Sequence, residues 1–141
     1  MCVLMACMFA KKVEGTIIAT NVGYIADSSL LVELKVQNGK IWMTSSKFFT
    51  WNSTDSLELD NSNGSLRYIS HAEALNQNGL GYTVNSTERL ISDFTCDYFQ
   101  SGELEIRANW GFTQKIKYGN GTCDDEAFLW EGGDSIEISL D

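Results

Sequence analysis

Apolar and polar residues alternate in short runs along much of the chain. In residues 30–37, leucine and valine occupy every second position, and the residues between them are Leu31, Glu33, Lys35 and Gln37. Isoleucine and leucine alternate with polar residues in the same way in residues 136–141 at the C-terminus. A period of two is typical of a β-strand with one face toward a core and the other toward water. Residues 70–76, where His71 lies, are the one stretch that we allow to be helical; it is barely two turns long, and a loop is the alternative.

Turn signals separate these runs. They are Asn38-Gly39, Asn63-Gly64, Asn78-Gly79, Asn120-Gly121, Ser101-Gly102 and Gly132-Gly133-Asp134. Asn and Gly tolerate the positive φ of tight hairpins. Parallel pairing needs long crossovers, so turns at this spacing favour antiparallel strands. The sequence predicts an all-β fold, namely an antiparallel sheet, a sandwich, or a curled, barrel-like meander of short strands. Asn38-Gly39 in particular is expected to turn the chain.

Residues 103–118 predict one hairpin in detail. Two alternating runs flank Asn109-Trp110-Gly111, and a three-residue loop ending in a left-handed glycine is a common hairpin connection. Counting outward from this loop sets Leu104 opposite Ile116, Glu105 opposite Lys115, and Glu103 opposite Lys117. The apolar pairs and the charged pairs therefore specify the same register.

The same count brings two cysteines together at the base of the hairpin. Cys96 and Cys123 fall one step from facing each other, and one bulge would close that step. A disulfide there would close a loop of about 28 residues and contribute about 3.5 kcal/mol. Such bonds persist in oxidising compartments. Two separate buried thiols, or two metal ligands, are the alternatives.

The start of the chain predicts export. Residues 1–10 are apolar, which is too short a stretch to span a bilayer. Leu4-Met5-Ala6-Cys7 resembles a bacterial lipobox, in which the cysteine is lipidated after cleavage. We therefore expect residues 1–12 to be the remnant of an export signal and a tether, with Cys7 as the lipid anchor and residues 13–141 as a single β domain. The alternative is a first strand with two buried thiols.

The C-terminal part contains a distinctive string. Cys96 and Ser101-Gly102 are followed, after the hairpin, by Tyr118-Gly119-Asn120-Gly121-Thr122-Cys123-Asp124. Over residues 90–141 the chain resembles a Bacteroidota-type group of secreted proteins and lipoproteins. The resemblance implies an envelope location, a β fold and a Cys96–Cys123 pair. It supplies no established activity.

The spacing of oxygen-bearing side chains suggests one metal site. Asn120, Thr122 and Asp124 alternate, and Glu131 stands at the twelfth position from Asn120, as in a calcium loop. However, the first position is Asn rather than Asp, and the sixth is Asp125 where the turn requires Gly. Calcium is the one cofactor suggested, and the alternative is a tight turn with its acids in water.

The tryptophans are the binding candidates. Trp110 lies in the hairpin loop, where it is expected to be exposed, and Trp42 points away from the face of Ile41 and Met43. Exposed aromatic rings are natural platforms for a sugar or a protein partner. The alternative is that Trp42, Trp51 and Trp130 fill a sandwich.

Charge and motifs narrow the function. The net charge of −9 disfavours nucleic acid as a partner. His71 is the only histidine, and no nucleophile motif accompanies it, so we expect it to be a surface loop residue. We therefore expect a non-catalytic envelope lipoprotein module, periplasmic, outer-membrane-associated or at the cell surface. It would bind glycan or an envelope protein, or be structural, and would meet the membrane through its lipid anchor only. A small envelope hydrolase and a calcium-stabilised β module are the alternatives.

Overall fold

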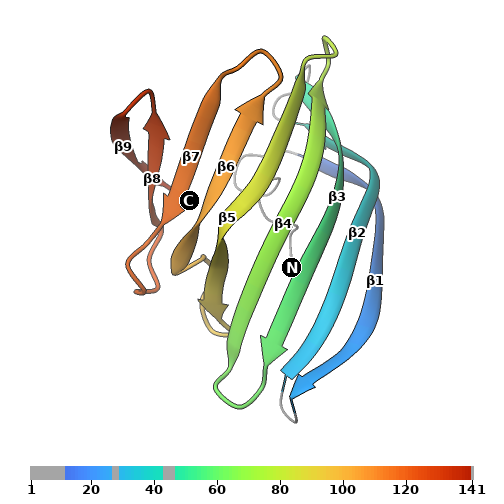
Figure 1. Ribbon diagram of the computed structural model, residues 1–141, viewed down its shortest axis with the longest axis vertical. Coiled ribbons are helices and arrows are strands. Elements are labelled where there is room, and N and C mark those ends of the chain that lie inside the picture. Colours follow the sequence, from blue (N-terminus) through green and yellow to red (C-terminus); the bar gives the residue numbers. More distant parts are fainter. Residues whose placement is uncertain (1–11, 27–28, 43–46, 141) are drawn as a thin grey trace.

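The computed structural model describes residues 12–26, 29–42 and 47–140. These residues form one sheet of nine antiparallel strands, in which each strand pairs with the next in chain order (Figure 1). The predicted all-β antiparallel fold is confirmed. Its form is an open meander of one sheet. The proposed signal remnant, including Cys7, lies outside the described residues.

The strands differ in length along the sheet. They are β1 (Lys12–Ala26), β2 (Ser29–Trp42), β3 (Phe48–Asp60), β4 (Ser65–Asn76), β5 (Gly81–Asp93), β6 (Ser101–Ala108), β7 (Thr113–Tyr118), β8 (Glu126–Glu131) and β9 (Asp134–Ser139). The first five have 12 to 15 residues. They are longer than the short strands predicted. The expected turn at Asn38-Gly39 lies inside β2, and the expected helix at residues 70–76 lies inside β4.

Asn38-Gly39 is a bulge inside β2, so the predicted turn is wrong. Asn38 has a φ of 53°, and the β2–β3 register shifts between Val36 and Gly39. A Cβ atom on Gly39 would lie 2.4 Å from the ring of Trp51. The bulge therefore lets the backbone of β2 pass against the indole, and only glycine fits there. Positive φ at Asn suits a bulge as well as a turn.

Residues 70–76 belong to β4, so the predicted helix is also wrong. Ala72 and Ala74 are half-buried, whereas His71, Glu73 and Leu75 are exposed, which is a period of two. β4 pairs with β3 on one side and β5 on the other. Pairing along both edges outweighs the high helix propensity of Ala, Glu and Leu. Ser101-Gly102 likewise begins β6 instead of forming a turn.

Alternation along the strands gives the sheet a buried face and a polar face. In β3, Trp51, Ser53 and Asp55 are buried, while the residues between them, Asn52 and Thr54, are exposed. We call the two sides the core face and the polar face. The main core cluster on the core face consists of Leu34, Leu57, Tyr68, Leu90, Leu104, Ile116, Tyr118, Ala127 and Leu140. Burying each large apolar side chain contributes about 1.5–3 kcal/mol.

The β6–β7 hairpin has the predicted register. Leu104 faces Ile116, Glu105 faces Lys115 and Glu103 faces Lys117. The amide of Ala108 donates to the carbonyl of Phe112 at 2.7 Å, and Gly111 has a φ of 97°. The three-residue loop therefore ends in a glycine with positive φ, as the sequence indicated.

The predicted disulfide between Cys96 and Cys123 is present, with the two Cα atoms 5.7 Å apart. Its setting differs from the ladder count. The β6–β7 pairing ends at Gly102 and Tyr118, so both cysteines lie in the connections that follow β5 and β7. The Gly121 amide donates to the Gln100 carbonyl at 2.8 Å and also joins these connections.

Candidate binding surface on the polar face

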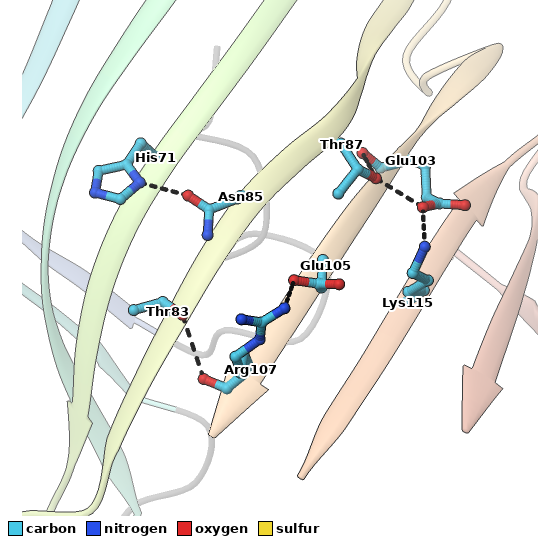
Figure 2. Close-up of polar contacts among 8 residues, drawn as sticks. All are labelled: His71, Thr83, Asn85, Thr87, Glu103, Glu105, Arg107 and Lys115. Atoms are coloured by element: carbon cyan, nitrogen blue, oxygen red, sulfur yellow. Dashed lines mark hydrogen bonds and ion pairs between the residues drawn. The ribbon is translucent and has the colours of Figure 1, made fainter. Parts of the chain in front are cut away.

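The polar face carries hydrogen-bonding and charged side chains across β4 to β7. Figure 2 shows His71 on β4, Thr83, Asn85 and Thr87 on β5, Glu103, Glu105 and Arg107 on β6, and Lys115 on β7. These positions alternate with core residues along each strand, so the fold itself places them together. The result is a polar surface without a hydrophobic cover.

Glu103 is the centre of this surface. Its carboxylate accepts a hydrogen bond from Lys115 Nζ at 2.8 Å and another from Thr87 Oγ1 at 2.7 Å (Figure 2). The hydrogen bond from Lys115 is the largest cause that lowers the pKa of Glu103, followed by that from Thr87, and attraction to Lys117 is the smallest. The same bond raises the pKa of Lys115. Both groups are therefore ionised near neutral pH.

The ion pairs differ from those expected from the register. Lys115 reaches diagonally to Glu103 rather than directly across to Glu105. Glu105 instead pairs with Arg107 on its own strand, at 2.8 Å. Diagonal neighbours on adjacent strands are within reach of long side chains. Lys117 makes no ion pair with any described residue, although it directly faces Glu103.

His71 is an exposed strand residue rather than the loop residue predicted. Its Nδ1 forms a hydrogen bond with Asn85 Oδ1 (Figure 2). The neighbouring Ser70 hydroxyl points to the core face, where it donates to Asp55 at 2.8 Å. In the described part of the chain, the side chain that orients His71 is therefore an amide and not the carboxylate of a Ser-His-Asp triad.

A hollow of about 410 Å³ lies beside Trp130 where β6, β7 and β8 meet, and we call it the Trp130 hollow. It is lined by Glu103, Thr113, Lys115, Lys117, Trp130 and Glu131, together with the Gly132-Gly133 turn. Trp130 directly faces Lys115 across the β7–β8 ladder, and 42% of its surface is exposed. The volume lies in the range of small-molecule sites.

The alternative interpretation, in which Trp130 fills a core, is wrong, because 42% of its surface is exposed. Ala127 and Leu129 face Ile138 and Ile136 on the core face, so Phe128 and Trp130 project from the polar face. The Gly132-Gly133 turn and the alternation of β9 were visible in the sequence. Pairing the two strands across that turn would have placed Trp130 opposite Ser135, on the polar face.

Trp110 is exposed at the hairpin tip, as predicted, with 53% of its surface accessible. Its ring packs edge-on against Tyr82, with the centroids 5.0 Å apart. Trp42 is only half-buried, but neighbouring side chains already cover part of its ring. The ammonium of Lys40 lies 4.2 Å from its centroid, and the ring of Phe48 lies 4.9 Å away. Trp42 therefore offers a ligand less open ring surface than Trp110 or Trp130.

Two other hollows provide a comparison. One of about 400 Å³ beside His71 has no aromatic residue in its lining. The other, of about 270 Å³ beside Asn109, contains Tyr82, whose ring contacts both Phe49 and Trp110. Of these three hollows, the Trp130 hollow combines polar groups with the most open aromatic ring.

Three of the four candidate calcium ligands lie together, and Glu131 lies apart from them. Thr122 donates to Asn120 Oδ1 at 2.8 Å and also bonds with Asp124, so these three side chains satisfy one another. Glu131 lies at the far end of β8, where it accepts a hydrogen bond from Gln114 at 3.1 Å. Five residues of strand after Glu126 separate it from the loop by about 16 Å. The twelve-residue spacing is thus not folded into a coordination loop.

Comparison with known proteins gives no match to a family model, a curated protein or a solved structure. Within the described ranges, no helix is long and apolar enough to cross a membrane. The Cys96–Cys123 disulfide is consistent with an extracellular or periplasmic location.

Proposed function

We propose that the chain is a non-catalytic module exported to the cell envelope, and that it binds glycan in the Trp130 hollow. The observation that carries the proposal is an exposed indole beside a hollow with carboxylate, ammonium and hydroxyl groups. A sugar ring has C–H groups on its faces and hydroxyls around its rim. The indole packs against the first, and the polar side chains bond to the second.

The disulfide supports an oxidising compartment. Attachment through lipid on Cys7 is part of the proposal, motivated by Leu4-Met5-Ala6-Cys7. Mass analysis of the protein purified from membranes tests the anchor separately. A lipid adduct on an N-terminal Cys7 supports it, and an unmodified N-terminus refutes it.

The test of glycan binding uses two matched tryptophans. The purified protein is screened on a glycan array, and the best ligands are measured by calorimetry. Trp130→Ala should weaken binding about tenfold or more, which corresponds to about 1.4 kcal/mol. Trp130→Phe should lose less, because an aromatic face remains. Trp110→Ala should bind as the wild type does.

Since Trp130 is already partly exposed, its removal should leave the unfolding midpoint nearly unchanged. Glycan binding that is equally strong in the folded Trp130→Ala variant would refute the site. The absence of any glycan ligand would refute the proposed function.

A second candidate is a protein partner at the β4–β5 and β6–β7 turns. Leu75, Leu80 and Trp110 are exposed there, and the Asn109 amide donates to the Gly81 carbonyl at 3.0 Å. Neighbouring exposed apolar and aromatic side chains often mark protein interfaces. Here Trp110→Ala would abolish capture of an envelope protein, whereas Trp130→Ala would leave it intact.

A further inference from the structure

The charges around the Trp130 hollow are not equally engaged. The carboxylate of Glu103 is held by Lys115 and Thr87, and that of Glu131 accepts a hydrogen bond from Gln114 Nε2 at 3.1 Å. Glu105 on the neighbouring part of β6 is paired with Arg107. The acids of the hollow and its rim are therefore already provided with donors.

Lys117 is the exception. It lines the hollow and is exposed, and it forms no ion pair with the residues that the structure describes. It directly faces Glu103, but the ammonium of Lys115 is the one that bonds that carboxylate. One carboxylate is thus shared unequally between two lysines, which leaves the second ammonium available to a ligand.

Lys117 is placed next to the aromatic residues. On β8 it faces Phe128, and Lys115 faces Trp130. Both rings are partly exposed, at 37% and 42%. Lys117 and Trp130 are diagonal neighbours on adjacent strands, a separation of about 7–8 Å that long side chains can span. A sugar ring stacked on Trp130 therefore has its rim within reach of the Lys117 side chain. An aromatic platform and an unengaged cation therefore stand side by side.

We infer that the ligand is a glycan bearing an anionic group, a carboxylate or a sulfate, which binds Lys117 while its sugar ring packs on Trp130. This inference rests on the proposed function. A charge-assisted bond to an ammonium is stronger than a neutral one. The net charge of −9 repels densely charged polymers, so well-spaced anionic groups are favoured over continuous ones.

The test uses pairs of glycans that differ only in charge. A xylo-oligosaccharide with a single glucuronate branch and its methyl ester form the carboxylate pair. A kappa-carrageenan oligosaccharide, which carries one sulfate per disaccharide and no carboxylate, and its desulfated form make the sulfate pair. The charged member of at least one pair should bind about tenfold more tightly than its neutral partner. Lys117→Gln should remove that preference, because it lowers the affinity for the charged member much more than the affinity for the neutral member.

Lys35→Gln is the matched control. Lys35 also projects from the polar face but is paired with Glu33 at 2.8 Å, so its removal should not change the preference. A preference lost in both variants would indicate a general effect of net charge and overturn the inference. Equal affinity for charged and neutral members, still dependent on Trp130, overturns the inference and leaves the proposed function standing. If no glycan binds the wild type in a way that depends on Trp130, both the inference and the proposed function are overturned.

Discussion

Removing the Cys96–Cys123 disulfide should lower the free energy of unfolding by about 3.5 kcal/mol. The two cysteines are 27 residues apart in sequence, so the bond closes a loop of about 28 residues in the unfolded chain. The loop-closure relation gives about 12 cal/mol/K for such a loop, which is about 3.5 kcal/mol at 25 °C. Domains of this size are stable by about 5–15 kcal/mol, so the loss should be large without abolishing the fold.

Urea unfolding followed by tryptophan fluorescence measures this loss. The Cys96→Ala/Cys123→Ala variant is compared with its parent in a background where Cys2 and Cys7 are replaced by serine. With a slope of about 2 kcal/mol/M, the midpoint should fall by about 1.5–2 M. Adding a reductant to the parent should reproduce the shift, and the double variant should not respond to it.

Equal midpoints for the parent and the double variant would refute the entropic reasoning. Mass analysis of the native protein gives a second check, because free thiols at both positions would show that the bond does not form. That result would also remove the main support for an oxidising location.

Two further predictions concern single residues. Gly39→Ala should destabilise the protein by about 1–3 kcal/mol, because the added Cβ would lie 2.4 Å from the Trp51 ring. The loss should shrink in a Trp51→Ala background, and an equal loss in both backgrounds would contradict the contact. Glu103→Gln should remove the contribution that the Glu103 carboxylate makes to the free energy of unfolding, and this contribution depends on pH. The folded pKa of Glu103 lies below its ordinary value of 4.5, so its contribution is complete above pH 4.5 and is lost as pH falls through the folded pKa. The stability gap between wild type and Glu103→Gln should therefore narrow below pH 4.5 in urea titrations, and a gap independent of pH would contradict this reasoning.

The β6–β7 hairpin could be predicted because its information is local. Apolar pairs such as Leu104 and Ile116 and charged pairs such as Glu103 and Lys117 fix the same register within sixteen residues of chain. The loop glycine, Gly111, adds a third, independent restraint. Three local signals that agree leave little room for another pairing.

The wrong predictions concern segments whose conformation depends on residues far away in the sequence. Asn38-Gly39 reads as a turn, yet Trp51 on the next strand packs against Gly39 and keeps the chain extended. Ala72 and Ala74 favour a helix by propensity, but β3 and β5 pair with that segment on both sides. The alternation of these residues with His71 and Glu73 was nevertheless a visible strand signal.

The sequence predicted the type of residue at the candidate site but not its position. Sequence reasoning expected an exposed tryptophan to carry binding, and it chose Trp110 and Trp42. Which ring is open depends on neighbours from other strands, such as Tyr82 beside Trp110. For Trp42, by contrast, the covering groups of Lys40 and Phe48 lie nearby in sequence. The hollow itself requires β6, β7 and β8 together, and no local pattern describes it.

The disulfide and the Trp130 hollow are linked by the fold. Cys96 lies in the connection that leads into β6, and Cys123 lies in the connection from β7 to β8. The bond therefore restrains the three strands that carry Glu103, Lys115, Lys117 and Trp130, although it lies outside the hollow that they line. Because the three strands are short, their mutual register depends on few ladder hydrogen bonds. The disulfide is therefore a covalent restraint that helps a hollow built from separate strands to keep its side chains in place.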